Sequence, residues 1–116
     1  MSDAAQQWLS GRASPPGMLA CGLRKPGGAL VCRSVEGLCP VAKMEKILAQ
    51  FESLEPALPQ GESAPRWTTW NFEQGQIRFV PRADGWLLGL VVRPDSAAAP
   101  KLDPLSEEFL ALQFDS

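Results

Sequence analysis

The stretch FVPRADGWLLGLVV, residues 79–92, carries the densest pattern of the chain and predicts the middle of its fold. Residues 76–80 alternate polar and apolar side chains, as in a strand with one buried face. Asp84-Gly85 is a common turn pair. Residues 86–92 are apolar without alternation, which indicates a strand covered on both faces. We therefore predict two strands joined by a turn, with the second strand in the middle of a sheet.

Three more strands are predicted before this stretch. Residues 66–72, RWTTWNF, are rich in aromatic and β-branched side chains, which favour strands. Residues 18–24 and 29–34 are short apolar runs separated by KPGG, residues 25–28. Glycine takes the positive φ that tight turns need, so these two runs predict a hairpin.

The register of this hairpin decides whether two thiols are neighbours. A turn centred between Pro26 and Gly27 would place Cys21 opposite Cys32. A turn centred on residues 27–28 would instead pair Leu23 with Cys32. In either case we expect small core residues rather than a disulfide, because a reducing cytosol keeps thiols free.

Residues 39–55 change to a period of about 3.6, which predicts an amphipathic helix in the middle of the chain. Pro40 suits the first helical turn, and Pro56 marks the end of the helix. Residues 56–65 are rich in proline, glycine and polar side chains, so they predict an exposed loop. The apolar face of the helix consists of Val41, Met44, Ile47, Leu48, Phe51 and Leu54.

Shorter helices are predicted near both ends. Within residues 1–16, a helix over residues 3–10 with Asp3 as N-cap precedes a proline-rich break. Residues 102–113 predict a last helix with Asp103 as N-cap. The predicted order is helix, strand, strand, helix, three strands, helix, in one domain that covers residues 1–116.

Composition narrows the classes of function. The net charge of −2, without a block of like charges, argues against a nucleic-acid partner. The longest apolar run, residues 86–92, is far shorter than the ~20 residues that span a bilayer. The first residues show no apolar stretch typical of a signal peptide. We therefore expect a cytoplasmic protein without a membrane span.

The sequence contains no histidine, which argues against most catalytic mechanisms. Serine and cysteine triads, the commonest general bases and most catalytic zinc sites depend on imidazole. The three cysteines form no CxxC pair. We therefore predict no catalytic residue, no metal and no cofactor. The enzyme alternative is a thiol-dependent redox protein that uses Cys39, at the start of the central helix, with Cys21 or Cys32.

Three arginines lie on or beside the last two strands and could gather as an anion site. We expect solvated strand ends instead, with Arg82 a solvated residue of the rim. The arginines are Arg78, Arg82 and Arg93, and the acids expected to balance them include Glu73, Asp84 and Asp95.

Three stretches together resemble the roadblock and dynein light chain family, within the profilin-like folds. They are MLACGLRKPGGALVCRS (residues 18–34), PVAKMEKILAQFESL (residues 40–54) and QIRFVPRADGWLLGLVV (residues 76–92). The resemblance implies an α/β fold of the α+β type: a five-stranded antiparallel sheet in the order α-β-β-α-β-β-β-α, with helices on both faces. The chain departs from the family in a shorter first helix, a proline-rich loop over residues 56–65 and a Pro-Gly-Gly turn.

Members of this family are usually non-enzymatic dimers, and many regulate small Ras-like GTPases or serve as scaffolds. The resemblance therefore implies a homodimer through the strand 66–72 and the helix 41–54, with a small GTPase as the partner class. A small dimeric adaptor, such as a secretion-type chaperone, is the alternative within the binding class. The predicted interface consists of Trp67, Thr69, Trp70, Phe72, Met44, Ile47, Leu48 and Phe51.

The two tryptophans of residues 66–72 add an argument from the residues alone. Trp67 and Trp70 have opposite parity along a strand, so their side chains point to opposite faces of the sheet. Aromatic side chains are enriched at the centres of protein interfaces. We favour an interface role for this strand, with packing inside the chain as the alternative.

Overall fold

The protein is described by a computed structural model, which describes residues 4–11, 17–35, 39–54, 67–72, 75–82, 84–93 and 99–112. Five strands form one antiparallel sheet in the order β2-β1-β5-β4-β3. The strands are β1 (Met18–Arg24), β2 (Leu30–Ser34), β3 (Thr68–Phe72), β4 (Gly75–Pro81) and β5 (Leu87–Val92). The helices are α1 (Ala4–Gly11), α2 (Val41–Leu54), the short 3-10 turn η3 (Ala99–Lys101) and α3 (Leu102–Ala111). The predicted α+β fold class is confirmed.

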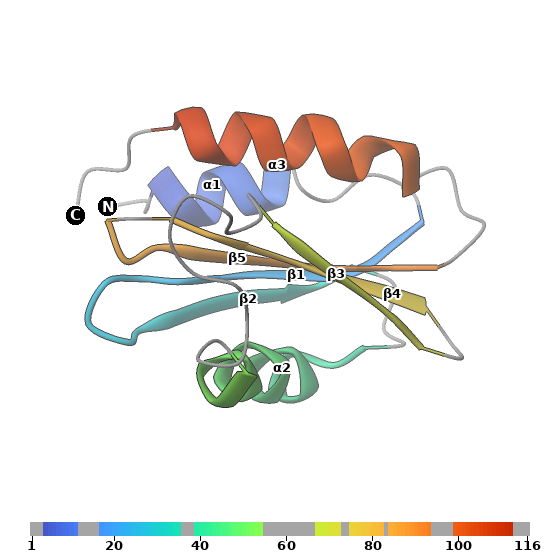
Figure 1. The fold of residues 1–116 in the computed structure, drawn as a ribbon, viewed down its shortest axis with the longest axis horizontal. Coiled ribbons are helices and arrows are strands. Elements are labelled where there is room, and N and C mark those ends of the chain that lie inside the picture. Colours follow the sequence, from blue (N-terminus) through green and yellow to red (C-terminus); the bar gives the residue numbers. More distant parts are fainter. Residues whose placement is uncertain are drawn as a thin grey trace.

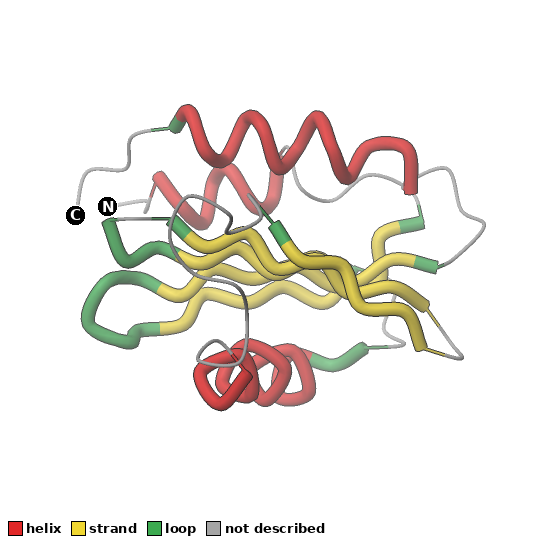
Figure 2. The backbone as a smooth tube through the Cα atoms, in the orientation of Figure 1, coloured by secondary structure: helices red, strands yellow, loops and turns green. Residues whose placement is uncertain are grey.

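Helices cover both faces of the sheet (Figures 1 and 2). On one face α1 packs on β1 and β2, while α3 packs on β4 and β5. On the other face α2 packs mainly on β1 and β2 and also meets β5. Each helix layer encloses its own apolar core, so the sheet separates two cores.

β5 is the central strand, and every one of its residues is buried. Leu88 and Leu90 point into the core beneath α1 and α3, whereas Leu87 and Val91 point into the core beneath α2. The absence of alternation in residues 86–92 therefore has the predicted cause, which is burial on both faces.

Two paired glycines let α2 approach the sheet closely. Gly22 of β1 lies opposite Gly89 of β5 on the α2 side. A Cβ atom at Gly89 would lie 2.7 Å from both Leu48 Cδ2 and Met44 Cε. At Gly22 it would lie 2.9 Å from Leu48 Cδ1. Leu48 therefore sits over both glycines, and side chains at these positions would push the helix outward.

The β1–β2 hairpin has neither of the two registers considered from the sequence. Cys32 lies opposite Gly22, because the turn is centred on Gly27. Both Gly27 and Gly28 have positive φ, as this tight turn requires. Cys21 then points into the core beneath α1 and α3, while Cys32 packs against the core beneath α2. The sheet lies between the two thiols, so a cross-strand disulfide is excluded.

The start of α3 also differs from the prediction. The N-cap is Lys101, which has helical φ and ψ and makes no side-chain capping bond. Because η3 runs directly into α3, Asp103 lies inside the first turn and its carboxylate binds Arg78 instead. The prediction of Asp103 as N-cap is therefore wrong.

Several predictions fall wholly or largely outside the described residues: the Asp3 cap, the proline-rich break at residues 14–17 and the loop over residues 56–65. The side chains of Leu54 and Phe72 also lie outside the description. Among the described residues, no helix is long and apolar enough to cross a membrane.

Candidate interaction surface

β3 ends the sheet, and its outer side has no strand beside it in the described part of the chain. β4 pairs with it along its whole length, from Thr68 opposite Phe79 to Phe72 opposite Gly75. An edge strand exposes a row of backbone N–H and C=O groups that can pair with another chain. Thr69, Trp70 and Asn71 are all exposed in this strand.

Trp70 is the main apolar group of this edge. Its side chain is 38% exposed, which makes it one of the two exposed large hydrophobic residues among those described. The indole meets the Phe79 ring edge-on, with 6.4 Å between ring centroids, and Phe79 stacks on Phe51 of α2 at 4.7 Å. Trp70 therefore continues an aromatic row from α2 toward the outside of the sheet.

The same face of the sheet continues from α2 toward β3. α2 is centred on β1 and β2, and it meets β4 where the Phe51 ring stacks on Phe79. Farther out, Ile77 of β4 is half-buried and lies opposite Trp70. We call the outer edge of β3 together with Trp70 and Ile77 the edge surface.

The predicted interface residues of α2 lie in the core of this chain. Met44, Leu48 and Phe51 are fully buried against the sheet, and Ile47 is buried beside them. A partner that meets α2 would contact its outer side instead, where Val41 is 42% exposed. These four side chains therefore hold α2 on the sheet and are not available to a partner on its surface.

Trp67 and Trp70 point to opposite faces of the sheet, as their parity predicts. Trp70 lies on the α2 side, while Trp67 packs against the core beneath α1 and α3. The guanidinium of Arg78 lies 5.1 Å from the centre of the Trp67 ring, a cation–π contact. Of the two tryptophans, Trp70 is the exposed one.

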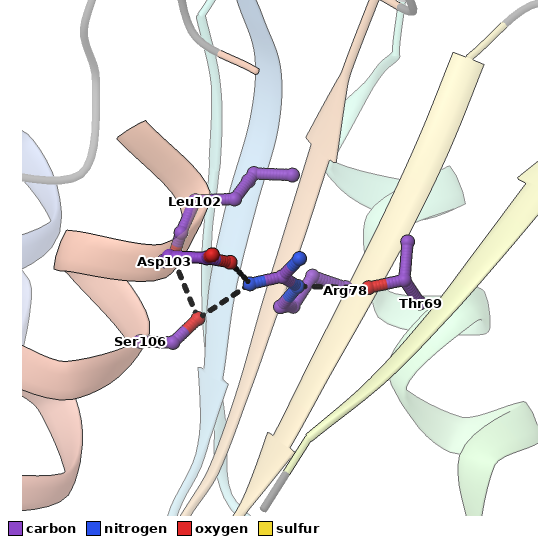
Figure 3. Close-up of polar contacts among 5 residues, drawn as sticks. All are labelled: Thr69, Arg78, Leu102, Asp103 and Ser106. Carbon is purple, nitrogen blue, oxygen red and sulfur yellow. Dashed lines mark hydrogen bonds and ion pairs between the residues drawn. The ribbon is translucent and has the colours of Figure 1, made fainter. Parts of the chain in front are cut away.

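Arg78 forms a link between β3 and α3 (Figure 3). Its Nε donates to Thr69 Oγ1 at 2.9 Å, and its Nη1 donates to Asp103 Oδ1 at 2.5 Å. Nη1 also lies 3.4 Å from Ser106 Oγ, which donates its own hydrogen to the Leu102 carbonyl at 2.6 Å. We call Arg78 with its partners Thr69, Asp103 and Ser106 the arginine link.

The expectation of solvated arginines is wrong for Arg78 and for Arg82. The Arg78 side chain is only 10% exposed, because α3 covers the face of β4 from which it projects. The Arg82 side chain is 11% exposed and binds the C-terminal end of α3, where Nη1 donates to the Phe109 carbonyl at 3.0 Å. Asp84 balances Arg82, as expected, through hydrogen bonds from Nε and Nη2. Two arginines of one strand region thus hold the two ends of α3.

The sequence does not predict the arginine link, because its residues are far apart along the chain. The alternating pattern of residues 76–80 predicts that Arg78 lies on a solvated face of the strand. Val80 lies on the same face, however, and is fully buried in the core beneath α3. Asp103, the group that balances Arg78, is 25 residues away in sequence. Its signal was an acid in the first turn of α3, which the helix dipole explains equally well.

The surroundings of Cys32 and Cys39 do not favour thiol chemistry. Burial raises the pKa of Cys32 to about 12, with a further contribution from the charge of Glu45. Burial also raises the pKa of Cys39, and the opposing effect of Lys43 is smaller. A nucleophilic thiol requires a lowered pKa. Neither Cys32 nor Cys39 is therefore ionised at neutral pH, and in the described residues no group of cysteine and acidic side chains could hold a metal.

Neither models of known protein families nor curated proteins match the chain.

Proposed function

We propose that the chain is a non-enzymatic protein-interaction domain that forms a homodimer through the edge surface. The observation that carries the proposal is Trp70, a large aromatic side chain 38% exposed on a strand that ends the sheet. Exposed aromatic groups on unpaired edges favour association, because partner binding removes apolar area and pairs backbone groups together.

The geometry favours a second copy as the occupant. Antiparallel pairing of β3 with its copy, about a two-fold axis perpendicular to the sheet, would join two five-stranded sheets into one. Such an axis keeps both α2 helices on the same face, with the two Trp70 side chains between them. A two-fold interface needs one self-complementary patch, and the edge surface supplies both the backbone row and the apolar side chain.

For the partner of this dimer we propose a small Ras-like GTPase, which rests on the resemblance to the roadblock family. The proposal predicts that the purified chain binds such a GTPase reversibly and is not itself chemically changed. Binding measured by calorimetry in GDP and in GTP-analogue states would test it. A panel of Ras-like GTPases that all fail to bind would remove this partner class and leave the dimer untouched.

The dimer itself is tested by solution mass and one substitution. Sedimentation equilibrium of the wild type should give a dimer at micromolar concentration, and Trp70→Glu should give a folded monomer, because a buried charge without a partner opposes association. Arg33→Glu is the matched control, since Arg33 is an exposed residue of β2 at the other end of the sheet. A monomeric wild type, or a Trp70→Glu variant that remains a dimer, contradicts the proposal.

A further inference from the structure

The edge surface depends on a strand that, in the described part of the chain, pairs with another strand on one side only. β4 is the main neighbour of β3, and β3 is the outermost strand. A strand held on one side loses order easily at its free edge, and ordering it during association lowers affinity. Any second anchor on β3 would therefore favour binding.

The arginine link is such an anchor. Arg78 leaves β4 on the side opposite to α2, and its fork reaches Thr69 on β3 through Nε and Asp103 on α3 through Nη1 (Figure 3). The same guanidinium lies over the ring of Trp67, immediately before β3. One side chain thus contacts Trp67 just before β3, Thr69 near the start of β3 and the first turns of α3.

We propose that Arg78 is a positioning residue for the edge surface: it couples the docking of α3 to the order of β3, and so sets the affinity of the dimer. This inference rests on the proposed function. Because Arg78 lies on the opposite face from Trp70, it acts on the partner only through β3.

The chemistry of the Arg78 side chain suits it to couple β3 to α3, beyond forming a simple ion pair with Asp103. A planar guanidinium presents donors in fixed directions, so it can hold two acceptors at once, whereas a lysine ammonium is a flexible point charge. Asp103 is 70% exposed, so it gains little from burial and its role is to balance and orient Arg78. Ser106, fully buried, accepts from the same Nη1 and fixes it from the α3 side.

Arg82 supplies a matched control within the same molecule. It is also an arginine next to β4, its side chain is about equally buried, and it also pairs with one aspartate and holds α3. The partners that the structure describes for it, Asp84 and Phe109, both lie outside β3. Changes at Arg82 and Asp84 should therefore loosen only the C-terminal end of α3, away from Asp103 and Ser106, and leave the arginine link and β3 in place.

The test compares four variants: Arg78→Lys, Asp103→Asn, Arg82→Lys and Asp84→Asn. Each is made in the Trp70→Glu background, so that hydrogen exchange reports on β3 in the monomer. We expect the first two to speed exchange of the β3 amides about tenfold relative to the last two, at similar exchange rates in β5. The β3 amides of the double variant Arg78→Lys with Asp103→Asn should exchange little faster than those of either single variant, because both substitutions break the same link.

The same substitutions without Trp70→Glu test the affinity. Arg78→Lys and Asp103→Asn should raise the dimer dissociation constant about tenfold, which corresponds to ~1.4 kcal/mol, while Arg82→Lys and Asp84→Asn leave it unchanged. Equal exchange of β3 in all four variants overturns the role of Arg78, whether or not the wild type dimerises. A monomeric wild type refutes the proposed function instead, and the exchange comparison in the monomer then still decides the coupling of α3 to β3.

Discussion

The glycine pair beneath α2 makes a quantitative prediction about Gly89→Ala. The added methyl group would lie 2.7 Å from Leu48 Cδ2 and 2.7 Å from Met44 Cε, inside normal contact distance. Overpacking of a core costs roughly 1–3 kcal/mol. Alanine restricts the unfolded chain more than glycine, which returns roughly 0.5–1 kcal/mol. We expect a net loss of about 1 kcal/mol in the free energy of unfolding, because two side-chain ends must move.

Urea unfolding followed by tryptophan fluorescence would measure this loss. Gly11→Ala is the control, since a Cβ at Gly11 would meet nothing within 4 Å, and it should be neutral or stabilising. Leu48→Ala removes one of the two obstructing groups, so Gly89→Ala should cost clearly less in that background. A Gly89→Ala variant as stable as the wild type, or one equally destabilised with and without Leu48, would refute the proposed close contact.

Three further predictions concern charge and thiols. Asp103→Asn should cost about 1–3 kcal/mol, because it leaves the buried guanidinium of Arg78 without its counter-charge. Arg78→Met should cost much less, because it leaves only an exposed carboxylate. Urea unfolding of both variants would give the reverse order if α3 does not cover Arg78. With a pKa of about 12 in the folded protein, Cys32 should resist a thiol reagent at pH 8 until the protein is unfolded. Because that pKa lies above the ordinary value of 9.0, the contribution of Cys32 to stability should be complete below pH 9 and decline as the pH rises toward 12; a native thiol titrating near pH 8 would contradict this. The pKa of Asp84 is lowered: its slight burial acts in the opposite direction, and hydrogen bonds from Arg82 and from the Trp86 backbone, with the charge of Arg82, outweigh it. The stability that Asp84 contributes should therefore be present at neutral pH and disappear in acid as the pH falls through that lowered pKa, so Asp84→Asn and wild type should differ in unfolding free energy at pH 7 and converge in strong acid.

The order of the elements was predictable because local pattern reports local structure. The prediction of β1 over residues 18–24 agrees with the strand Met18–Arg24, and that of the central helix differs from α2 by one or two residues at each end. Apolar periodicity identifies these elements without knowledge of their neighbours. The hairpin register was not predictable in the same way, since three successive turn positions in KPGG differ by single residues.

The candidate surface could be predicted only in part. The opposite directions of Trp67 and Trp70 follow from parity along the strand, and this prediction is confirmed. The edge position of β3 is given by the order of the strands in the sheet. Which tryptophan remains exposed depends on which face a helix covers. That α2 stops short of Trp70 while Arg78 and α3 cover Trp67 is a matter of packing between distant segments.

By itself, the sequence determined the number, type and order of the elements and the central place of β5, because these follow from periodicity, turn residues and the absence of alternation. Only the tertiary structure decided which charged groups are buried and which partners they have. Arg78 reads as a solvated residue in its strand, yet it lies beneath α3 because Asp103 and Ser106 meet it from a helix that the chain reaches later. Burial of a charge depends on what packs over it, and that is a property of the whole fold.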